Sequence, residues 1–531
     1  MYSSAVVTTT HGPVRGRVTD AVTAFKGIRY GADTAAYRFQ PPRPPAPWTE
    51  VVNAFEFGPT APQDHPEQST DRATNPWLQM MGLTDNLPES EDCLFLNVWT
   101  PSTAAQAAEA GQDAPARPVL VWVHSGGYSD NSGSSPSVDG AHLAREHDLV
   151  TVSFNHRLGV LGYTQLVDPA EAGSPYATSG NVGQLDIVAA LEWVRDNIAA
   201  FGGDPGNVTL AGQSGGAMKI SCLLAMPRAQ GLFHKAVLQS GTTARVLEPR
   251  QAAAVTARLR ASAALTPDAG PEELAGMDLK ALMRAYKATA EGLTTFGPVL
   301  DGRVIPAHPF SPASVALSGD KPLILGDLDT EATLFLLHSR DALVSAGPEE
   351  VTRRLAAVAG HDLADALVSA ITAGHGPLDG YELAVQVLSD GLFTGPAHLA
   401  ALRRAAGASA PTWRYRNALR TPAQDGALMS PHELDVALTF GNIHTATGLN
   451  GDTPEAHAVS RLLGATWAAF ARDGDPANAT IPTWPAYTAE ERQVLLIDAG
   501  PRVVTNPDGA ALDVAAGAQD TPVNWFAVAG T

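Results

Sequence analysis

A single serine stands among glycines in the segment LAGQSGGAMK, residues 210 to 219. Residues 212 to 216 fit the pattern G-x-S-x-G, which presents a serine hydroxyl on a sharp turn between a strand and a helix. The plainer interpretation is a small residue in a glycine-rich loop, because so short a pattern also arises by chance. A serine hydroxyl is a poor nucleophile. Ser214 therefore needs a base, a carboxylate that orients the base, and donors for an oxyanion elsewhere in the chain.

A second glycine turn, HSGG at residues 124 to 127, begins at the last residue of the apolar run VLVWVH. It resembles the HGGG-type loop of esterases, whose backbone N–H groups face the substrate carbonyl. An ordinary glycine turn is the alternative, and the serine motif downstream makes that alternative less favoured. We predict that the N–H groups of Gly126, Gly127 and Gly215 form an oxyanion hole.

Short apolar runs that end in turn residues predict the strands that must position these groups. The runs lie at residues 94–99, 119–124, 149–155, 208–212, 235–241 and 322–327. Helical patterns separate several of them, for example at residues 183–202, where apolar residues recur near the helical period. Continuous apolar strands that alternate with helices indicate a mostly parallel sheet covered on both faces, so the predicted class is α/β.

The composition is that of a globular protein and excludes several kinds of partner. Of 531 residues, 44% are hydrophobic and 17% are charged, and the formal net charge is −20. No cluster of Lys and Arg interrupts this negative charge, so we expect neither nucleic acid nor an anionic membrane surface as a partner. No apolar stretch of about 18 residues is present, so no membrane-spanning helix is predicted.

Cys93 and Cys222 are the only cysteines in the chain. The first residues show no basic segment followed by a continuous apolar one, so no secretory signal is predicted. Two cysteines without an export signal are most simply two reduced thiols. We therefore expect a cytoplasmic protein.

Longer segments around these candidates form recognisable motifs. They are SEDCLFLNVW (residues 90–99), FNHRLGVLGY (154–163), the nucleophile region (181–217), and further segments at 231–241, 298–306, 432–442 and 470–476. Together they resemble the type B carboxylesterase and cholinesterase family, and in particular its bacterial, para-nitrobenzyl esterase-like members. This resemblance implies the α/β-hydrolase fold, in which helices flank a mostly parallel central sheet and a helical cap is inserted.

The resemblance also implies that residues 1–531 form one α/β-hydrolase domain. Within it, residues 1–245 carry the oxyanion loop and the nucleophile. Residues from about 245 to 425 are expected to be largely helical insertions with the acid strand near 321–331. Residues from about 425 to 531 are expected to carry the catalytic histidine.

The family's catalytic acid falls in the pattern G-x-x-x-x-E after a strand. In this chain the pattern spans residues 326 to 331 and ends at Glu331. Asp327 and Asp329 are nearby competitors, and a solvated turn carboxylate is the plainer interpretation for both. The resemblance therefore implies Glu331 as the acid that follows Ser214 in the chain.

The family's catalytic base lies about ten residues before its F-G-N motif. Counting back from residues 440 to 442 leads to His432. The main rival among fifteen histidines is His124, which by family resemblance supports the oxyanion loop instead. The resulting chain order of serine, acid and histidine is the usual one for this fold.

Several further residues have supporting roles by resemblance. Ser240 is expected beside the acid, where its hydroxyl could bind the carboxylate of Glu331, although a small buried strand residue is an equal alternative. Gln213 and His124 are expected next to the catalytic groups. Two ion pairs are expected to fix the loops around the site. They are Arg38 with Glu91 and Arg157 with Asp186.

Three positions depart from the usual family sequence. Gln213 replaces a common Glu before the serine, Gly215 replaces Ala after it, and Ser125 replaces the first Gly of the oxyanion loop. Glutamine removes a negative charge beside the nucleophile, so we expect cationic alcohols to be favoured less than in cholinesterases. Gly215 still supplies an N–H group and adds backbone freedom, which could make room for a bulky acyl or tertiary alcohol group.

Residues 60–90 are rich in Pro, Asp and Asn, and a long irregular segment of this kind is typical of a functional loop. The candidates for the mouth of the pocket are Trp77, Leu78, Met80 and Met81. An apolar cluster buried under the loop is an equally good interpretation. We expect residues 60–90 and 245–425 to shape the pocket.

These residues together predict a serine carboxylesterase that acts on small-molecule esters through an acyl-enzyme. The same chemistry could serve carbamates, aryl diesters or activated amides. A non-catalytic binding protein of the same fold is the distant alternative, because some relatives have lost the triad and function does not follow from fold. The resemblance implies no metal ion and no cofactor, and it is compatible with a monomer or a homodimer.

Overall fold

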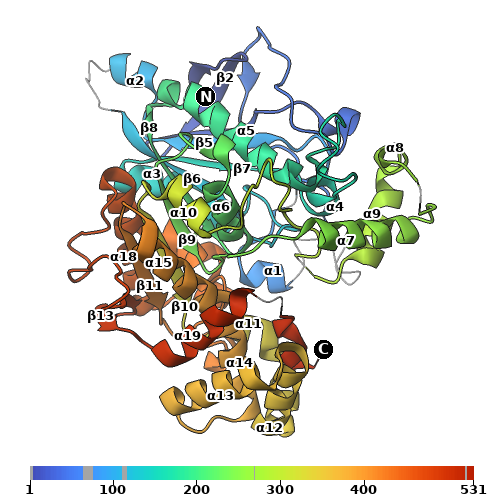
Figure 1. The fold of residues 1–531 in the computed structure, drawn as a ribbon. Coiled ribbons are helices and arrows are strands. Elements are labelled where there is room, and N and C mark those ends of the chain that lie inside the picture. The colour runs from blue at the N-terminus through green and yellow to red at the C-terminus, as the bar shows by residue number, and fades with distance from the viewer. Residues whose placement is uncertain are drawn as a thin grey trace.

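The computed structural model describes residues 4–63, 76–85, 87–109, 116–267, 269–292, 294–520 and 523–530. A single large sheet runs through these residues, and helices lie on both of its faces (Figure 1). The strands are β1 (Ser4–Thr8), β2 (Pro13–Thr19), β3 (Val22–Arg29), β4 (Val52–Asn53), β5 (Phe95–Thr100), β6 (Arg117–Val123), β7 (Val150–Phe154), β8 (Gly203–Gln213), β9 (Lys235–Gln239), β10 (Leu323–Leu328), β11 (Thr412–Asn417), β12 (Gln493–Ile497) and β13 (Arg502–Thr505).

The strands follow the order β1-β2-β3-β5-β7-β6-β8-β9-β10-β11-β12-β13, and β4 pairs with β2. All neighbours from β7 through β6, β8, β9, β10 and β11 to β12 are parallel, whereas both ends of the sheet are antiparallel. Parallel strands place their carboxyl ends at one edge. The loops after β6, β8, β10 and β11 therefore meet there.

The helices before the middle of the chain are α1 (Pro76–Met80), α2 (Ala104–Glu109), α3 (Ala141–His147), α4 (Gly159–Tyr163), α5 (Val182–Asn197), α6 (Gly215–Leu224), α7 (Pro249–Ser262), α8 (Pro271–Ala275) and α9 (Leu279–Thr289). The later helices are α10 (Pro312–Ser318), α11 (Thr333–Leu336), α12 (Arg340–Ala359), α13 (His361–His375), α14 (Gly380–Ser389), α15 (Gly395–Gly407), α16 (Leu434–Phe440), α17 (Thr447–Asn450), α18 (Pro454–Asp473) and α19 (Gly509–Gly517). A π-helical turn, Asp390–Thr394, joins α14 to α15.

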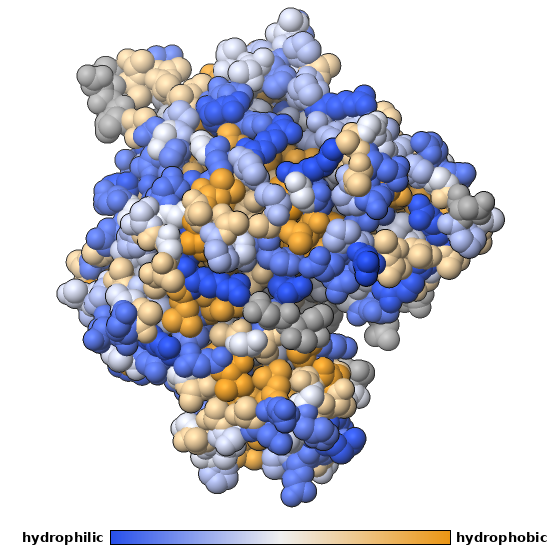
Figure 2. Space-filling model, viewed as in Figure 1, coloured by the Kyte–Doolittle hydropathy of each residue, from blue (hydrophilic) through white to orange (hydrophobic). Residues whose placement is uncertain are grey.

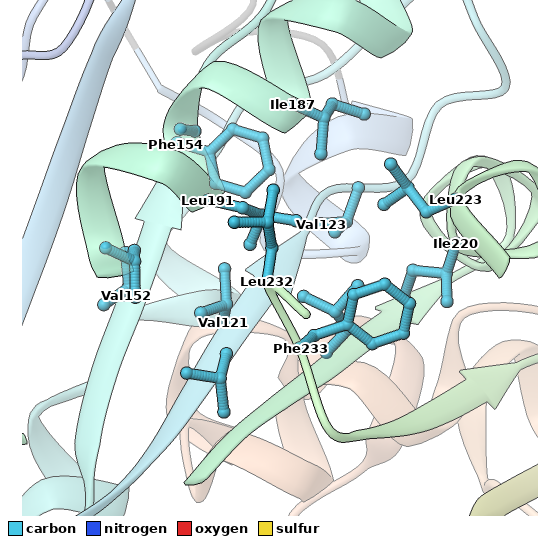
Figure 3. Close-up of a cluster of buried hydrophobic side chains, with 14 of the residues drawn as sticks. Val121, Val123, Val152, Phe154, Ile187, Leu191, Ile220, Leu223, Leu232 and Phe233 are labelled. Atoms are coloured by element: carbon cyan, nitrogen blue, oxygen red, sulfur yellow. The ribbon is translucent and has the colours of Figure 1, made fainter. Parts of the chain in front are cut away.

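Strand β6 shows how the sequence builds a sheet with two buried faces. Its alternate residues Val119, Val121 and Val123 pack in the cluster that includes α5 and α6. The residues between them, Leu120 and Trp122, pack instead with α16 and α18. Figure 3 shows the first of these clusters, in which Val121, Val123, Val152 and Phe154 lie beside Ile187, Leu191, Ile220 and Leu223. Successive side chains of a strand point to opposite faces, so a continuous apolar run is required here.

Two groups of helices extend beyond the sheet. Helices α12, α13 and α14 pack with α19 around their own apolar cluster at the bottom of Figure 1. Helices α7 and α9 contact each other and project to the right in the same view. Figure 2 shows apolar side chains at the surface around α11 and α14. Phe335 and Phe526, 39% and 43% exposed, are among the large apolar residues on the surface.

The α/β class predicted from the sequence is confirmed, since each predicted strand has its counterpart in β5 to β10 and α5 covers most of the predicted helix. The boundaries differ by a few residues at most positions, and β8 begins earlier, at Gly203, than the run of apolar residues suggested. Among the described residues, no helix is long and apolar enough to cross a membrane.

Candidate active site

Ser214 occupies the turn between β8 and α6. Its backbone has φ 52° and ψ −123°, a conformation that side-chain-bearing residues rarely adopt and that marks a strained functional turn. The Ser214 N–H donates to the carbonyl of Gln239 at 2.8 Å, which ties the turn to the end of β9. A Cβ on Gly241 would lie 2.0 Å from the carbonyl oxygen of Ser214, so only glycine allows the two backbones to approach this closely.

Glu331 and His432 meet at the carboxyl edge of the sheet. The imidazole Nδ1 of His432 lies 2.6 Å from Oε2 of Glu331, and both side chains are buried. The second oxygen of Glu331, Oε1, accepts from the backbone N–H of Leu328 at 2.8 Å. The carboxylate is therefore fixed by β10 and in turn fixes the orientation of the imidazole.

Backbone contacts between two loops hold this pair together. Thr330 donates its N–H to the carbonyl of Ser430 at 3.2 Å, and Ser430 donates its N–H to the hydroxyl of Thr330 at 2.9 Å. The N–H of His432 donates to the carbonyl of Glu331 at 3.2 Å. The acid and the histidine are 101 residues apart in sequence, so their contact depends on these two adjacent strand ends.

The two competing aspartates are engaged elsewhere. Asp327 is fully buried and forms ion pairs with Arg414 and Arg416. Asp329 pairs with Arg420 at 3.2 Å near the surface. The structure thus brings Glu331, and neither aspartate, to the imidazole of His432.

The electrostatic environment favours the protonated form of His432. Burial lowers the pKa of its imidazole, but the charge of Glu331 and the hydrogen bond to it outweigh this effect, so the pKa is raised from its ordinary value. Glu433 and Asp435, which are also buried, act in the same direction. An imidazole with this setting readily accepts a proton during a reaction.

Gln213 lies against the other nitrogen of the same ring. Its amide Nε2 is 3.1 Å from Nε2 of His432, the nitrogen that faces away from Glu331. The amide Oε1 of Gln213 is buried and has no hydrogen-bond partner among the described residues. The residue before the serine therefore contacts the imidazole directly.

The expected hydrogen bond from Ser240 to the carboxylate of Glu331 is wrong. Ser240 has a positive φ of 50° at the end of β9, and its buried hydroxyl has no hydrogen-bond partner in the described part of the chain. Glu331 is bound by the backbone of Leu328 and by His432 instead.

The loop after β6 packs directly against the start of α6. Gly126 and Gly127 both have positive φ, 85° and 59°. A Cβ on Gly215 would lie only 2.1 Å from the carbonyl oxygen and 2.4 Å from the nitrogen of Gly127. The backbone of Gly127 is therefore adjacent to Gly215 at the N-terminus of α6, where free N–H groups and the helix dipole favour an anion.

His124, the rival base, lies outside the triad geometry. Its Nδ1 is 3.0 Å from the carbonyl of Ser125, and its ring stacks on that of His156 with centroids 4.7 Å apart. The side chain is buried at the root of the glycine loop. This position agrees with the supporting role that the family resemblance implied.

Glu433 was missed by sequence reasoning. The Ser125 hydroxyl hydrogen-bonds the buried Glu433 carboxylate and also accepts from Nδ2 of Asn131 at 2.8 Å. Burial raises the pKa of Glu433, and the bond from Ser125 opposes this effect. The serine that departs from the family's glycine thus links the oxyanion loop to the neighbour of His432. The sequence carried no signal for this contact, because Ser125 and Glu433 lie in distant segments.

A cavity of about 350 Å³ opens onto Ser214. Its described lining comes from the loop after β9, from residues 294–298, from the π-helical turn and from the C-terminal region. Tyr128, Met218, Leu392, Phe393 and Trp525 contribute apolar surface. Arg245 is the one charged side chain among the described lining residues.

The expected contribution of residues 60–90 to this lining is wrong for the part that the structure describes. Met80 and Met81 are buried in the core cluster that contains Trp122 and α18, so the apolar-cluster interpretation applies to them. Leu78 packs against the same cluster. The side chain of Trp77 lies outside the described residues. The expected contribution of residues 245–425 to the lining is confirmed, since many lining residues come from that range.

Two aromatic rings cover the imidazole of His432. The ring of Phe393, from the π-helical turn, lies 4.6 Å from the ring of His432, and that of Phe335 lies 5.2 Å away. Such rings exclude water from one face of the imidazole. Phe393 also lines the cavity, so a bound substrate would meet it beside His432.

Both expected ion pairs are formed. Arg38 donates from Nε and Nη2 to Glu91 at 2.7 and 2.5 Å. Arg157 donates from the same two atoms to Asp186 at 2.8 and 2.6 Å, and the two side chains are 1% and 0% exposed. These two-point contacts are the geometry in which arginine binds carboxylates most strongly.

The two cysteines are buried and free. Cys93 lies in the core beside β5, and Cys222 lies in α6. Burial raises the pKa of the Cys222 thiol to about 12, so this thiol stays protonated and unreactive at neutral pH.

Comparison with known proteins decides the family. A family model described as "Carboxylesterase family" matches residues 3–514. The chain belongs to the carboxylesterase family. The family motifs that the sequence suggested are thereby confirmed over nearly the whole chain.

Characterised carboxylesterase relatives are similar over their full length. The para-nitrobenzyl esterase of Bacillus subtilis (strain 168) is 31% identical over 517 residues, which cover 95% of this chain and 96% of the relative. The phenmedipham hydrolase of Pseudarthrobacter oxydans is 33% identical over 512 residues, covering 94% and 96%.

Solved carboxylesterase structures share the fold. The carboxylesterase Est55 of Geobacillus stearothermophilus superposes with a TM-score of 0.81 at 33% identity, over 96% of this chain and 99% of that one. An esterase from Clostridium hathewayi, described as able to hydrolyse aliphatic aromatic polyesters, superposes with a TM-score of 0.77 at 28% identity, over 98% and 99%. The chain described here therefore has the α/β-hydrolase fold and is a carboxylic ester hydrolase.

Proposed function

We propose that the protein hydrolyses carboxylic esters through an acyl-enzyme on Ser214, with His432 as the base and Glu331 as the acid that orients it. The observation that carries the proposal is the 2.6 Å contact between His432 Nδ1 and Glu331 Oε2, next to a serine on a strained turn. In this arrangement Nδ1 keeps its proton toward Glu331 and Nε2 is left to act as the base.

Acylation begins when Ser214 Oγ attacks the ester carbonyl and its proton passes to Nε2 of His432. The tetrahedral intermediate then collapses, the bond to the alcohol oxygen breaks, and His432 returns the proton to the leaving alcohol. A water molecule repeats the sequence on the acyl-enzyme and releases the carboxylic acid. The raised pKa of His432 suits both halves of this cycle, because the imidazole must accept and return a proton.

The N–H groups of Gly126, Gly127 and Gly215 are the proposed donors to the oxyanion. The support is the contact between Gly127 and Gly215, which places the loop after β6 at the N-terminus of α6. Each such donor is worth about 10²- to 10³-fold in rate in other acyl-transfer enzymes.

The proposed substrates are small, mostly apolar esters. The described lining is largely apolar and includes no carboxylate, so a cationic alcohol finds no counter-charge there. Carbamates and aryl diesters are further candidates, and a relative named phenmedipham hydrolase and a similar structure described as hydrolysing aliphatic aromatic polyesters support a range of substrates wider than simple esters. Activated amides share the same acyl-transfer chemistry.

The protein is further proposed to work in the cytoplasm, as a monomer or homodimer, and without nucleic acid. Its buried, free cysteines are compatible with a reducing compartment. The net charge of −20 opposes binding to nucleic acid.

An organophosphonate carrying a fluorophore tests the triad, because it reacts covalently only with an activated serine. We expect stoichiometric labelling of wild type and none of Ser214→Ala, with the adduct mapped to the peptide containing residue 214. Hydrolysis of nitrophenyl esters with acyl chains of increasing length, followed by carbamate and aryl-diester panels, measures the substrate class. Wild type that neither labels nor hydrolyses any nitrophenyl ester would favour the non-catalytic alternative and end the proposal.

A further inference from the structure

A lysine lies inside the helix that carries the nucleophile turn. Lys219 is the only charged residue of α6, whose sequence is GGAMKISCLL, and its exposed fraction is 0%. Lysine is almost never fully buried without a partner, because removing an ammonium from water is costly. The proposed mechanism assigns no role to this side chain.

The Lys219 amine has one specific contact. Nζ donates to the backbone carbonyl of His124 at 3.1 Å. Within the described residues no carboxylate lies at ion-pair distance from Nζ, and Asp130 is the acidic group whose charge acts on it from farther away. Burial lowers the pKa of Lys219 to about 7. Helix α6 therefore holds an amine that is shielded from water and has no carboxylate beside it among the described residues.

The acceptor of this bond is the first residue of the oxyanion loop. His124 immediately precedes Ser125, Gly126 and Gly127, so its carbonyl is at the root of the loop. The titratable ring next to this root is that of His156, which stacks on His124. Burial lowers the pKa of His156, and the charge of Lys219 acts in the same direction. The bond thus connects α6 to the end of β6 at the point where the loop departs.

Backbone contacts between α6 and the same loop leave little freedom at two other points. A Cβ on Gly216 would lie 2.0 Å from the carbonyl oxygen of Val123, and one on Gly215 would lie 2.1 Å from that of Gly127. The helix start is therefore pressed against both sides of the loop. The hydrogen bond from Lys219, one helical turn further on, links the helix to the root of the loop through a side chain, and a second side-chain bond joins Cys222 of α6 to Tyr128 beyond the glycines.

We infer that Lys219 is a positioning residue, which holds the oxyanion loop against α6 through the carbonyl of His124 and so sets the N–H groups of Gly126 and Gly127 relative to that of Gly215. The inference rests on the proposed function, since it assumes that these N–H groups stabilise an oxyanion. A buried lysine without an ion pair lowers the stability of the fold. Its role in holding the loop in place explains why such a residue is present here.

Lys219→Met separates the two effects, because methionine keeps an unbranched side chain and removes the amine. We expect the urea midpoint of unfolding to rise, since the desolvated amine is gone. We expect kcat for a nitrophenyl ester to fall by about tenfold or more, with KM changed by less than about twofold, because the loss is in stabilisation of the transition state. If the role of Lys219 were purely structural, Lys219→Met would instead lower the urea midpoint and leave kcat per folded molecule unchanged.

Binding of a trifluoromethyl ketone provides a second measurement, because its hemiketal oxygen occupies the oxyanion position. The inhibition constant should weaken in Lys219→Met in proportion to the loss in kcat/KM. Lys219→Gln, whose side chain is one atom shorter and keeps an N–H donor, should recover most of both losses. It also provides the test if the methionine variant fails to fold.

Lys235→Met is the matched control. Lys235 is a buried lysine at the first residue of β9, at the opposite edge of the sheet from Ser214, and its amine bonds Asn207. This variant should leave kcat and the ketone inhibition constant unchanged. Unaltered kcat and ketone binding in Lys219→Met would overturn the inference, as would an equal loss in the control. Phosphonate labelling of Ser214 in the same variants reports separately on the proposed function.

Discussion

The side-chain amide nitrogen of Gln213 lies 3.1 Å from Nε2 of His432, the ring nitrogen that the proposed mechanism assigns to the Ser214 proton. With the Nδ1 proton held toward Glu331, Nε2 of the neutral imidazole accepts a hydrogen bond, and the amide is its partner in this structure. In the proposed mechanism, Gln213 and Ser214 would therefore compete for one lone pair of Nε2. An amide stabilises the neutral ring, whereas a carboxylate at the same place would stabilise the imidazolium.

Gln213→Glu should therefore shift the pH profile. A carboxylate near Nε2 raises the pKa of His432, and the base works only when neutral, so activity is lost at a higher pH as the solution is acidified. We expect the acidic limb of kcat/KM to move up by about 1 to 2 pH units, since an opposite charge at this distance has such an effect. A profile measured with a nitrophenyl ester checks it, and Gln213→Met, which removes the amide's hydrogen bond but adds no charge, should show a clearly smaller upward shift.

Glu331→Gln should remove most of the activity without unfolding the protein. The amide cannot hold the Nδ1–H tautomer of His432 as the carboxylate does, and the comparable change in a serine protease costs roughly 10⁴-fold in kcat. Asp327→Asn provides the contrast. It leaves the buried Arg414 without its counter-charge and Arg416 with that of Asp508 alone, so it should lower the urea midpoint while kcat of the folded protein is kept. A loss of kcat in Asp327→Asn as large as in Glu331→Gln would contradict the assignment.

Gly215→Ala should impair catalysis, because this chain packs the oxyanion loop directly against residue 215. The new methyl group would meet the backbone of Gly127 at 2.1 to 2.5 Å, so the oxyanion loop must move away from α6. Displacing one donor should lower kcat by about 10- to 10²-fold, with KM little affected. Single-turnover measurement of acylation isolates the step. Wild-type acylation in this variant would show that the loop can move without cost.

Arg157→Met should destabilise the fold strongly because it leaves Asp186 buried and unpaired. We expect a loss of about 3 to 5 kcal/mol in the free energy of unfolding. The exposed pair Arg195 and Asp196 gives the control, and Arg195→Met should change stability by less than about 1 kcal/mol. Urea denaturation followed by tryptophan fluorescence measures both. An equal loss in the free energy of unfolding at the two sites would show that the buried pair stabilises the fold no more than the exposed one.

Much of the fold could be predicted because the parallel strands are buried on both faces. Runs such as VLVWV have no polar position to interrupt the apolar pattern, and the structure shows why, since Leu120 and Val121 point to opposite apolar clusters. The extended start of β8 at Gly203 could not be seen, because its first residues pair by backbone and carry no apolar pattern.

The catalytic candidates could be located because each lies in a motif at a strand end. What the motifs did not specify is side-chain direction. Nothing in the sequence shows whether the Ser240 hydroxyl bonds Glu331 or, as in the described structure, has no hydrogen-bond partner. Likewise, the bonds of Ser125 to Glu433 and of Lys219 to His124 join segments that are distant in sequence, and a single sequence carries no record of such pairs.

Glu331 and His432 are brought together from positions 101 residues apart, and Ser214 is separated from each of them by a longer stretch of chain. Local structure alone cannot assemble such a site, because β8, β9, β10 and β11 must all be in register before the groups meet. Hydrolysis is thus a reporter of completed folding. During refolding, secondary structure should return first, and turnover should return only when the last of these long-range strand pairings closes.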